Sequence, residues 1–283
     1  SLPGGKFLVA LPGPPAELIP MAQKHLPPFL KRFTGKTVIR SRTLKTTGLT
    51  ESEIDVKVRN ILGLKGSVTV GIYAHPEQVD LRITARGSDQ KAADRLIAQV
   101  EKKIRRRLGR LIYGADEETL ESVVGLLFRK RRLTLGVAES CTGGLVQHRI
   151  TEISGSSDYF RGGAVTYANE LKTVATFVSP ALLKKHGAVS AEVAQAMATG
   201  IRRLTQADCG LAITGIAGPT GGSKQKPVGL VYIALSTPRG TQVIRRQLSG
   251  DRSTIKFKAS QTALNLLRLH LLKMVPGTKT AQL

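Results

Sequence analysis

The second half of the chain alternates short apolar runs with helix-length segments, and this alternation restricts the folds that it can adopt. Apolar runs of strand length occur at 133–138, 163–167 and 210–214, with segments of helical apolar spacing around them. Such alternation is typical of α/β domains. Two more runs, at 228–236 and 242–248, are close enough to pair as a hairpin, so we expect a mixed sheet in a three-layer α/β sandwich. The expected helices cover 119–131, 143–152, 169–176, 190–205 and 251–273.

The first half of the chain predicts a smaller α+β module in the order β-α-β-β-α, with its helices on one face of a sheet. Thr50 followed by Glu53 is a capping-box pattern, which marks the start of the first helix. Ser88 is the expected cap of the second. The expected strands cover 37–44, 67–73 and 79–85, and the expected helices 50–62 and 89–107.

The residues before and between these two parts have weaker patterns. We expect a strand at 6–11, a helix at 16–33 that the prolines at 27 and 28 interrupt, and a linker at 112–118. The chain is therefore expected to hold a short first piece at 1–35, the small α+β module at 36–115 and the α/β domain at 116–283.

The sequence ESCTGG at 139–144 lies where an expected strand gives way to a helix. Backbone N–H groups at a helix start are unpaired, and the helix dipole adds partial positive charge there. Such groups can hold an oxyanion, so Ser140 is a candidate nucleophile. The alternative is that Ser140 or Thr142 only caps the helix.

Cys141 is the rival nucleophile, because a thiol at a helix start has a lowered pKa. A cysteine nucleophile usually needs a histidine base. The nearest histidine, His148, lies seven residues further along the same helix, a rise of about 10 Å. We therefore expect Cys141 to be a buried residue.

The sequence TYANELK at 166–172 also ends a strand and begins a helix, with Asn169 as the expected cap. Neighbouring parallel strands end in one crevice, so Lys172 is expected to point towards Ser140. A lysine can act as the base for a serine when burial lowers its pKa. The alternative is that Lys172 is an ordinary surface charge.

Two further clusters could bind an anion. The sequence TGIAGPTGG at 214–222 forms a glycine-rich loop whose N–H groups could make a nest for phosphate, with a flexible turn as the alternative. The sequence SGDR at 249–252 puts Arg252 at a helix start, where it suits a bidentate contact to phosphate or carboxylate. Asp251 would equally serve as the cap of that helix.

The formal net charge of +23 is spread over the chain, with +12 in residues 1–115 and +11 in residues 116–283. Such a surface attracts anions, nucleic acid among them. The basic runs at 102–107 and 129–132 could bind nucleic acid or could be solvated helix faces. The GxxG at 63–66 matches a motif of KH-type RNA binders, although here it links a helix to a strand. Only twelve aromatic residues are available for base stacking.

Several classes of protein have no support in the sequence: disulfide-rich, metal-binding, membrane-spanning and secreted proteins. The two cysteines cannot build a disulfide framework, and neither CxxC nor HExxH occurs, so no metal site is expected. Apolar runs are too short to span a membrane. The first six residues lack the basic start and apolar stretch of a secretory signal. We therefore expect a cytoplasmic, reducing location.

Taken together, the motifs of residues 138–252 resemble the C-terminal domain of the CinA family, named for competence/damage-inducible protein A. Residues 36–115 resemble the KH-like module of that family. LPGPPAEL at 11–18 resembles the end of its N-terminal molybdopterin-binding-like domain, so residues 1–35 are expected to be a remnant of that domain. The motifs are AESCTGG at 138–144, GSS and YF within 155–160, TYANELK at 166–172, HGAVS at 186–190, TGIAGPTGG at 214–222, KPVG at 226–229 and SGDR at 249–252.

The resemblance implies a nicotinamide-nucleotide amidase of pyridine nucleotide salvage. It would hydrolyse nicotinamide mononucleotide to nicotinic acid mononucleotide and ammonia, with no cofactor or metal. Ser140 would be the nucleophile and Lys172 its base, with Tyr167 beside the nicotinamide ring. The family also suggests a homodimer. The alternative is a non-catalytic, competence-related protein that binds nucleic acid or nucleotides. The implied substrate-binding residues are Glu139, Cys141, Thr142, Gly143, Thr214, Gly215, Ala217, Gly218 and Arg252.

Overall fold

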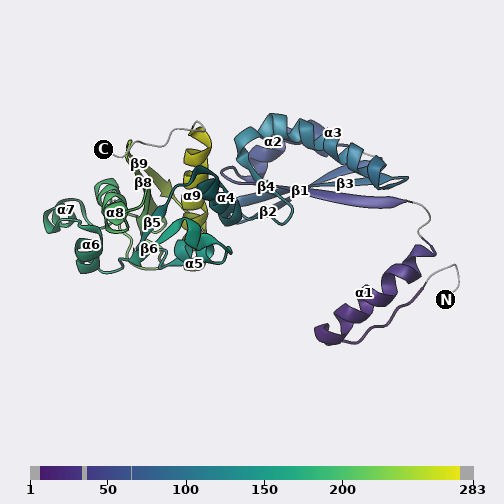
Figure 1. Cartoon of the computed structure of the whole chain (residues 1–283), viewed down its shortest axis with the longest axis horizontal. Helices are drawn as coiled ribbons and strands as arrows, with labels where there is room; N and C mark the ends of the chain where they lie inside the picture. The colour runs from purple at the N-terminus through teal and green to yellow at the C-terminus, as the bar shows by residue number, and fades with distance from the viewer. Residues whose placement is uncertain (1–6, 34–36, 65, 275–283) are drawn as a thin grey trace.

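The computed structural model describes residues 7–33, 37–64 and 66–274, which form two sheets, the helices that cover them and one separate helix near the start of the chain (Figure 1). The first sheet is antiparallel and has the strand order β2-β3-β1-β4. Its strands are β1 (Val38–Thr46), β2 (Val68–His75), β3 (Gln78–Gly87) and β4 (Ile112–Ala115).

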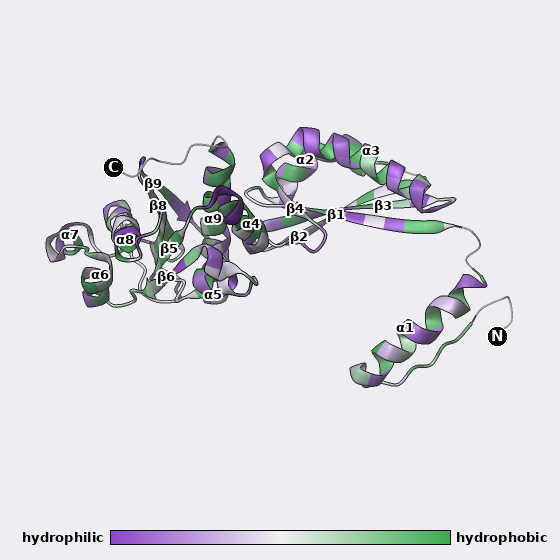
Figure 2. Ribbon diagram, viewed as in Figure 1, coloured by the Kyte–Doolittle hydropathy of each residue, from purple (hydrophilic) through white to green (hydrophobic). Residues whose placement is uncertain are grey.

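Helices α2 (Glu51–Leu62) and α3 (Gln90–Leu108) cover one face of this first sheet (Figure 1). Alternate residues of β3, Leu81 and Ile83 among them, point into the core between sheet and helices and are fully buried. Hydrophobic and hydrophilic residues alternate along α3, as an amphipathic helix requires (Figure 2). The predicted small α+β module is therefore confirmed.

Two details of this module differ from the sequence-based expectation. The expected linker at 112–118 is wrong in its first part, because β4 pairs with the end of β1 and so completes the sheet. The cap of α3 is Asp89 rather than Ser88, since the Asp89 carboxylate accepts a hydrogen bond from Ala92 N at 2.8 Å. The capping box of Thr50 and Glu53 at the start of α2 is confirmed.

The second sheet has the order β6-β5-β7-β8-β9. Strands β6, β5 and β7 are parallel, and β8 and β9 run antiparallel to their neighbours, so the predicted mixed sheet is confirmed. Its strands are β5 (Leu135–Glu139), β6 (Phe160–Val165), β7 (Cys209–Gly215), β8 (Leu230–Thr237) and β9 (Gly240–Gln247).

Helices cover both faces of the second sheet, which gives the predicted three-layer sandwich. On one face Phe128, Leu211 and Leu264 belong to a single apolar core. On the other face Met197 and Ala212 belong to a second core. The helices of the first face are α4 (Leu120–Arg131), α5 (Leu145–Thr151) and α9 (Arg252–Lys273); those of the second are α6 (Asn169–Thr176), α7 (Pro180–His186) and α8 (Ala191–Leu204).

Most helix starts in this domain follow the sequence signals. Ser190 caps α8 by accepting from Val193 N, and Asp251 caps α9 by accepting from Thr254 N at 2.7 Å. Helix α5 begins two residues later than expected. Gly143 and Gly144 both have positive φ, at 63° and 93°, so they form a turn before the helix.

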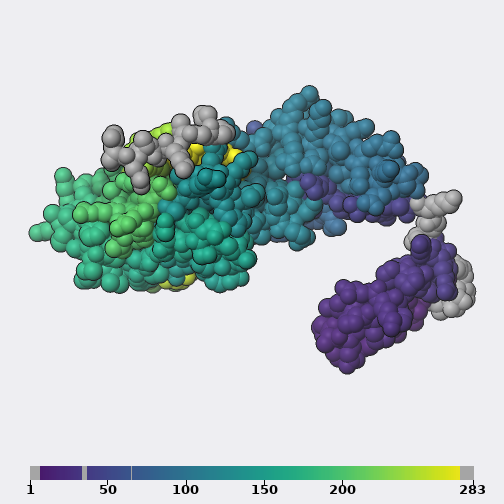
Figure 3. Space-filling view, viewed as in Figure 1, coloured from purple at the N-terminus to yellow at the C-terminus, as the bar shows by residue number. Residues whose placement is uncertain are grey.

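Helix α1 (Pro15–Lys31) lies apart from both sheets, and none of its residues is buried (Figure 3). It continues through Pro27 and Pro28, so the predicted interruption is wrong. The φ of proline suits a helix, but proline has no N–H group to donate to the carbonyl oxygen four residues before it. In an exposed helix water can donate to that oxygen instead. Residues 7–12 form no strand, because no neighbouring strand accepts their hydrogen bonds; residue 6 lies outside the described residues.

The two sheets are connected through Arg268 of α9. Its buried guanidinium donates to the carbonyl oxygens of Arg110 and Ile112, at 2.6 and 3.3 Å, where the first module ends. Through the ranges given above, no helix is both long and apolar enough to cross a bilayer.

Candidate active site

A cavity of about 300 Å³ lies over the carboxyl ends of β5, β6 and β7. Ser140 follows β5, Tyr167 follows β6, and Thr214 lies near the end of β7. Parallel strands bring these positions to one edge of the sheet. The cavity is also lined by residues that were all named from the sequence: Cys141, Lys172, Gly215, Ala217, Gly218 and Arg252.

Glu139, Thr142 and Gly143 do not line this cavity. The Glu139 side chain is fully buried, and its carboxylate accepts hydrogen bonds from the backbone N–H groups of Gly144, Val146 and Gln147. Glu139 therefore holds the start of α5, although it precedes the helix by six residues. Neither Ser140 nor Thr142 caps α5.

The turn at 140–144 leaves two backbone donors beside Ser140. The Ser140 N–H donates to Ile213 O at 2.9 Å, and the Gly143 N–H donates to Ser140 O at 3.0 Å. The N–H groups of Cys141 and Thr142 donate to no backbone carbonyl among the described residues. Of these two residues only Cys141 lines the cavity, so its N–H is the donor available to an oxyanion there.

Lys172 is 1% exposed, so the interpretation as a surface charge is wrong. Its Nζ donates to the carbonyl oxygens of Thr166 at 2.8 Å and Tyr167 at 3.2 Å. Burial lowers the pKa of the Lys172 ammonium. A neutral amine has two hydrogens, which these two carbonyls accept, and a lone pair that remains for a proton.

No hydrogen bond joins Ser140 Oγ to Lys172 Nζ among the described residues, although both residues line the cavity. Contacts between catalytic groups are often loose before substrate binds. Asn169 also lines the cavity, but as the first residue of α6. Its predicted role as the cap is wrong, since Ala168 takes that position.

Cys141 lines the cavity, but burial raises the pKa of its thiol to about 12. The nearby Glu139 charge acts in the same direction. The thiol is therefore protonated near neutral pH, which makes it a poor nucleophile. His148 is exposed on α5 and lies 3.9 Å from the carboxylate of Glu152, so it does not serve Cys141 as a base.

Arg252, at the start of α9, connects two other walls of the cavity. Its Nη2 donates to Tyr167 Oη at 2.9 Å, and its Nη1 donates to Gly218 O at 2.8 Å. The Tyr167 side chain belongs to a residue that is 58% exposed, so the arginine holds it at the mouth of the cavity. This contact between residues 85 positions apart depends on the tertiary structure.

Sequence analysis did not name Ala188 and Val189 as site residues, yet both line the cavity. The buried Thr214 hydroxyl donates to Ala188 O at 2.8 Å and so holds this wall against β7. The HGAVS motif at 186–190 was the available signal, but its reactive side chains, those of His186 and Ser190, do not line the cavity.

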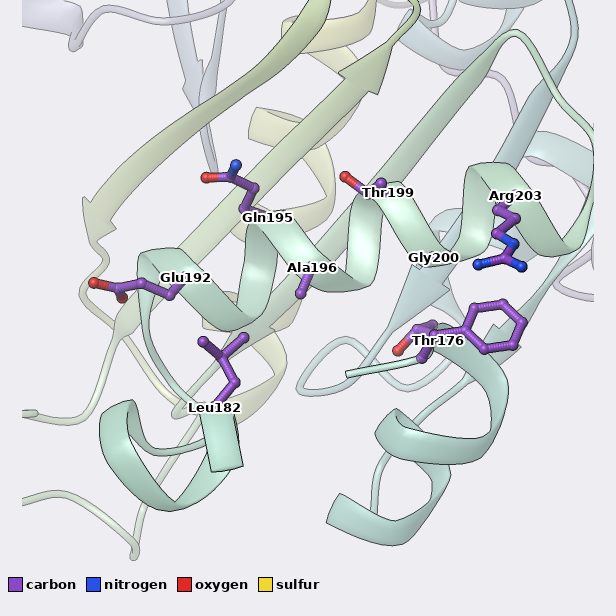
Figure 4. A pocket seen from close by; sticks show the side chains of 9 residues that line it. Thr176, Leu182, Glu192, Gln195, Ala196, Thr199, Gly200 and Arg203 are labelled. Atoms are coloured by element: carbon purple, nitrogen blue, oxygen red, sulfur yellow. The ribbon is translucent and has the colours of Figure 1, made fainter. Parts of the chain in front are cut away.

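A second cavity, of about 480 Å³, lies beside α8 and is lined by residues of α6, α7 and α8 (Figure 4). The Arg203 guanidinium lies over the Phe177 ring, 5.2 Å from its centre. None of the residues predicted from the sequence lines it. Within the described ranges, no three His, Cys, Asp or Glu side chains gather into a group that could hold a metal.

The fold and the cavity define an α/β domain with a polar site over parallel strand ends, preceded by a small α+β module. The CinA C-terminal domain family matches residues 117–271. The family described as the damage-inducible protein CinA KH domain matches residues 41–114. The chain therefore belongs to the CinA family, as its motifs predict.

Relatives and solved structures agree with this assignment. A putative competence-damage inducible protein of Caldanaerobacter subterraneus subsp. tengcongensis is 48% identical over 94% of this chain, and one of Moorella thermoacetica is 49% identical over 93%. This chain spans 64% of the length of either relative. The crystal structure of competence damage-inducible protein A from Klebsiella pneumoniae has a TM-score of 0.54 and 33% identity, and covers 55% of this chain and 97% of its own.

Proposed function

We propose that this chain hydrolyses the carboxamide of nicotinamide mononucleotide, giving nicotinic acid mononucleotide and ammonia. The observation that carries the proposal is the buried Lys172 amine, whose lowered pKa favours the neutral form, in the same cavity as Ser140. A serine becomes a nucleophile when a nearby base takes its proton. The family resemblance supplies the substrate, and the cavity chemistry is compatible with it.

The first step forms the acyl-enzyme. The Lys172 lone pair takes the proton of Ser140 Oγ, and the oxygen attacks the carboxamide carbon. The resulting oxyanion accepts a hydrogen bond from the N–H group of Cys141, a residue that lines the cavity. Lys172 then gives its proton to the amide nitrogen, the C–N bond breaks, and ammonia leaves.

The second step consumes one water. Lys172 takes a proton from the water, whose oxygen attacks the ester carbon. The bond to Ser140 Oγ breaks, and the serine regains its proton from Lys172. The product is the carboxylate of nicotinic acid mononucleotide, with one proton released at neutral pH. The two steps together convert one amide and one water into one carboxylic acid and one ammonia, and they use no cofactor or metal.

In this proposal Tyr167 lies beside the nicotinamide ring, and Arg252 fixes the tyrosine through its hydroxyl. Gly215, Ala217 and Gly218 also line the cavity. Glu139 acts as a positioning residue, because it holds the turn that carries Ser140 without lining the cavity.

The test measures ammonia release from nicotinamide mononucleotide by the whole chain. We expect release by the wild type and by the control Ser88→Ala, whose exposed serine lies in the first module, and none by Ser140→Ala. Circular dichroism checks that both variants are folded. Absence of release by folded wild-type protein contradicts the proposal. Release by Ser140→Ala would move the nucleophile to another group.

A second candidate is binding to nucleic acid, favoured by the exposed Lys102, Lys103 and Arg106 on α3. Any protein this basic binds DNA more weakly as salt increases, so a salt-dependent affinity alone would not separate the two functions. Binding of one sequence or structure in preference to random duplex, by wild type and Ser140→Ala alike, would support this candidate.

We also propose a homodimer and a cytoplasmic location. Leu171 and Val174 of helix α6 and Phe177, the residue that follows it, are exposed, with Val174 at 73%, and clustered exposed apolar residues mark interaction surfaces. Sedimentation equilibrium tests the dimer: a monomer mass at micromolar concentration contradicts it. Fluorescence of a tagged full-length protein in cells tests the location.

A further inference from the structure

Helix α9 carries two cationic side chains close to the active-site cavity, those of Arg252 and, one helical turn later, Lys256. Lys256 and Arg252, together with Leu145, Asp251 and Ser253, line a cavity of about 480 Å³. Arg252 also lines the cavity that contains Ser140. Arg252 therefore belongs to the walls of both cavities, and a ligand longer than a nicotinamide ring could extend from one into the other.

The Lys256 side chain reaches the turn that carries Ser140. A Cβ placed on Gly143 would lie 3.6 Å from Lys256 Nζ, so the ammonium lies directly over that glycine. Its charge is also felt at Cys141, where it lowers the pKa of the thiol against the larger effect of burial. The Lys256 side chain thus extends from α9 to the turn that carries the proposed nucleophile.

Neither cation is neutralised by a carboxylate among the described residues. Lys256 has no ion pair and no hydrogen-bond partner in this part of the chain. Arg252 donates to Tyr167 and Gly218 only, so three of its five N–H donors remain. A pair of unneutralised cations at one cavity is an anion-binding arrangement.

Asp251 lies on the same cavity, but its carboxylate is engaged with its own helix. It accepts hydrogen bonds from Thr254 N and from the Ser253 hydroxyl. The side chain and backbone of Thr254, and then Ser253, lower its pKa. The carboxylate therefore takes part in the cap of α9, and it forms no ion pair with Lys256 among the described residues.

We propose that Lys256, together with Arg252, binds the 5′-phosphate of the substrate and so selects nucleotides over nucleosides. This inference rests on the proposed function, which puts the carboxamide at Ser140. The phosphate then occupies the adjoining cavity, beside Lys256. Lys256 is a specificity-determining residue: it contacts the phosphate and takes no part in proton transfer.

The test compares two substrates that differ only in the phosphate, nicotinamide mononucleotide and nicotinamide riboside. Lys256→Gln is expected to lower kcat/KM for the mononucleotide by about 10- to 100-fold, mainly through KM, as the loss of a charge-assisted contact implies. Its kcat/KM for the riboside should stay within twofold of wild type. Lys273→Gln, the same change at the exposed far end of α9, should leave kcat/KM unchanged for both substrates.

An equal loss for both substrates, or no loss for either, overturns the inference. If wild-type protein deamidates neither substrate, the proposed function fails, and ligand binding then tests the phosphate site separately. Nicotinic acid mononucleotide should raise the Tm of wild type and of Lys273→Gln more than that of Lys256→Gln. Equal shifts in all three proteins overturn the phosphate site.

Discussion

Replacing Glu139 by glutamine tests how the turn at Ser140 is held. The change keeps the shape of a fully buried side chain and removes its charge. Glu139 Oε2 accepts from Gly144 N and Val146 N, both at 3.1 Å, and Oε1 accepts from Gln147 N at 2.9 Å. An amide has one acceptor oxygen, so in the variant an NH₂ group would face at least one of these donors.

The expected loss of stability follows from these contacts. Removing a negative charge from a helix N-terminus costs about 0.3–2 kcal/mol. Leaving one buried donor unsatisfied costs about 1–3 kcal/mol. We therefore expect Glu139→Gln to lower the free energy of unfolding by about 3 kcal/mol. For a domain of this size, the Tm should fall by about 6–12 °C.

Thermal unfolding followed by circular dichroism measures this loss, with deamidase activity measured beside it. Glu152→Gln is the matched control at the other end of α5, where the side chain is 67% exposed. Its Tm should change by less than about 2 °C. If Glu139→Gln unfolds at the wild-type temperature and only raises KM, Glu139 contacts the substrate and the reasoning from the helix start is refuted.

Three further predictions concern groups around the same cavity. Because burial lowers the pKa of Lys172 and its neutral form is the base, kcat/KM should rise with pH through that pKa and then level off; a rate that falls over this range contradicts the assignment. Cys141→Ala should keep at least a third of the wild-type kcat, and iodoacetamide should label the native thiol slowly at pH 8, because its pKa is about 12; rapid labelling would show a thiolate. A methyl group on Gly200 of α8 would collide with Thr176 O of α6, so Gly200→Ala should destabilise the protein by about 1–3 kcal/mol in urea unfolding, and an unchanged midpoint would disprove the close packing of these helices.

Local patterns were sufficient for the fold class. The alternation of apolar strands and helices from 133 onward predicted a mixed sheet between helices, and the caps Thr50, Ser190 and Asp251 marked helix starts. Patterns failed where a contact distant in sequence decided the outcome. Strand β4 looked like a linker because four residues carry little periodicity, and the end of β1 makes them a strand.

The motifs were enough to name the candidate site residues and to predict where the strands that carry them end. Ser140, Lys172, Tyr167 and Arg252 were all named from motifs. The parallel order of β6, β5 and β7 brings the first three to one cavity, and Arg252 joins them from the start of α9. Their protonation states and contacts could not be read from the motifs. A pKa depends on burial and on neighbouring charges, and both arise only when distant segments pack together. Only the folded chain shows that Lys172 is buried with a lowered pKa, that the Cys141 thiol stays protonated, and that Glu139 holds the helix start without reaching the cavity.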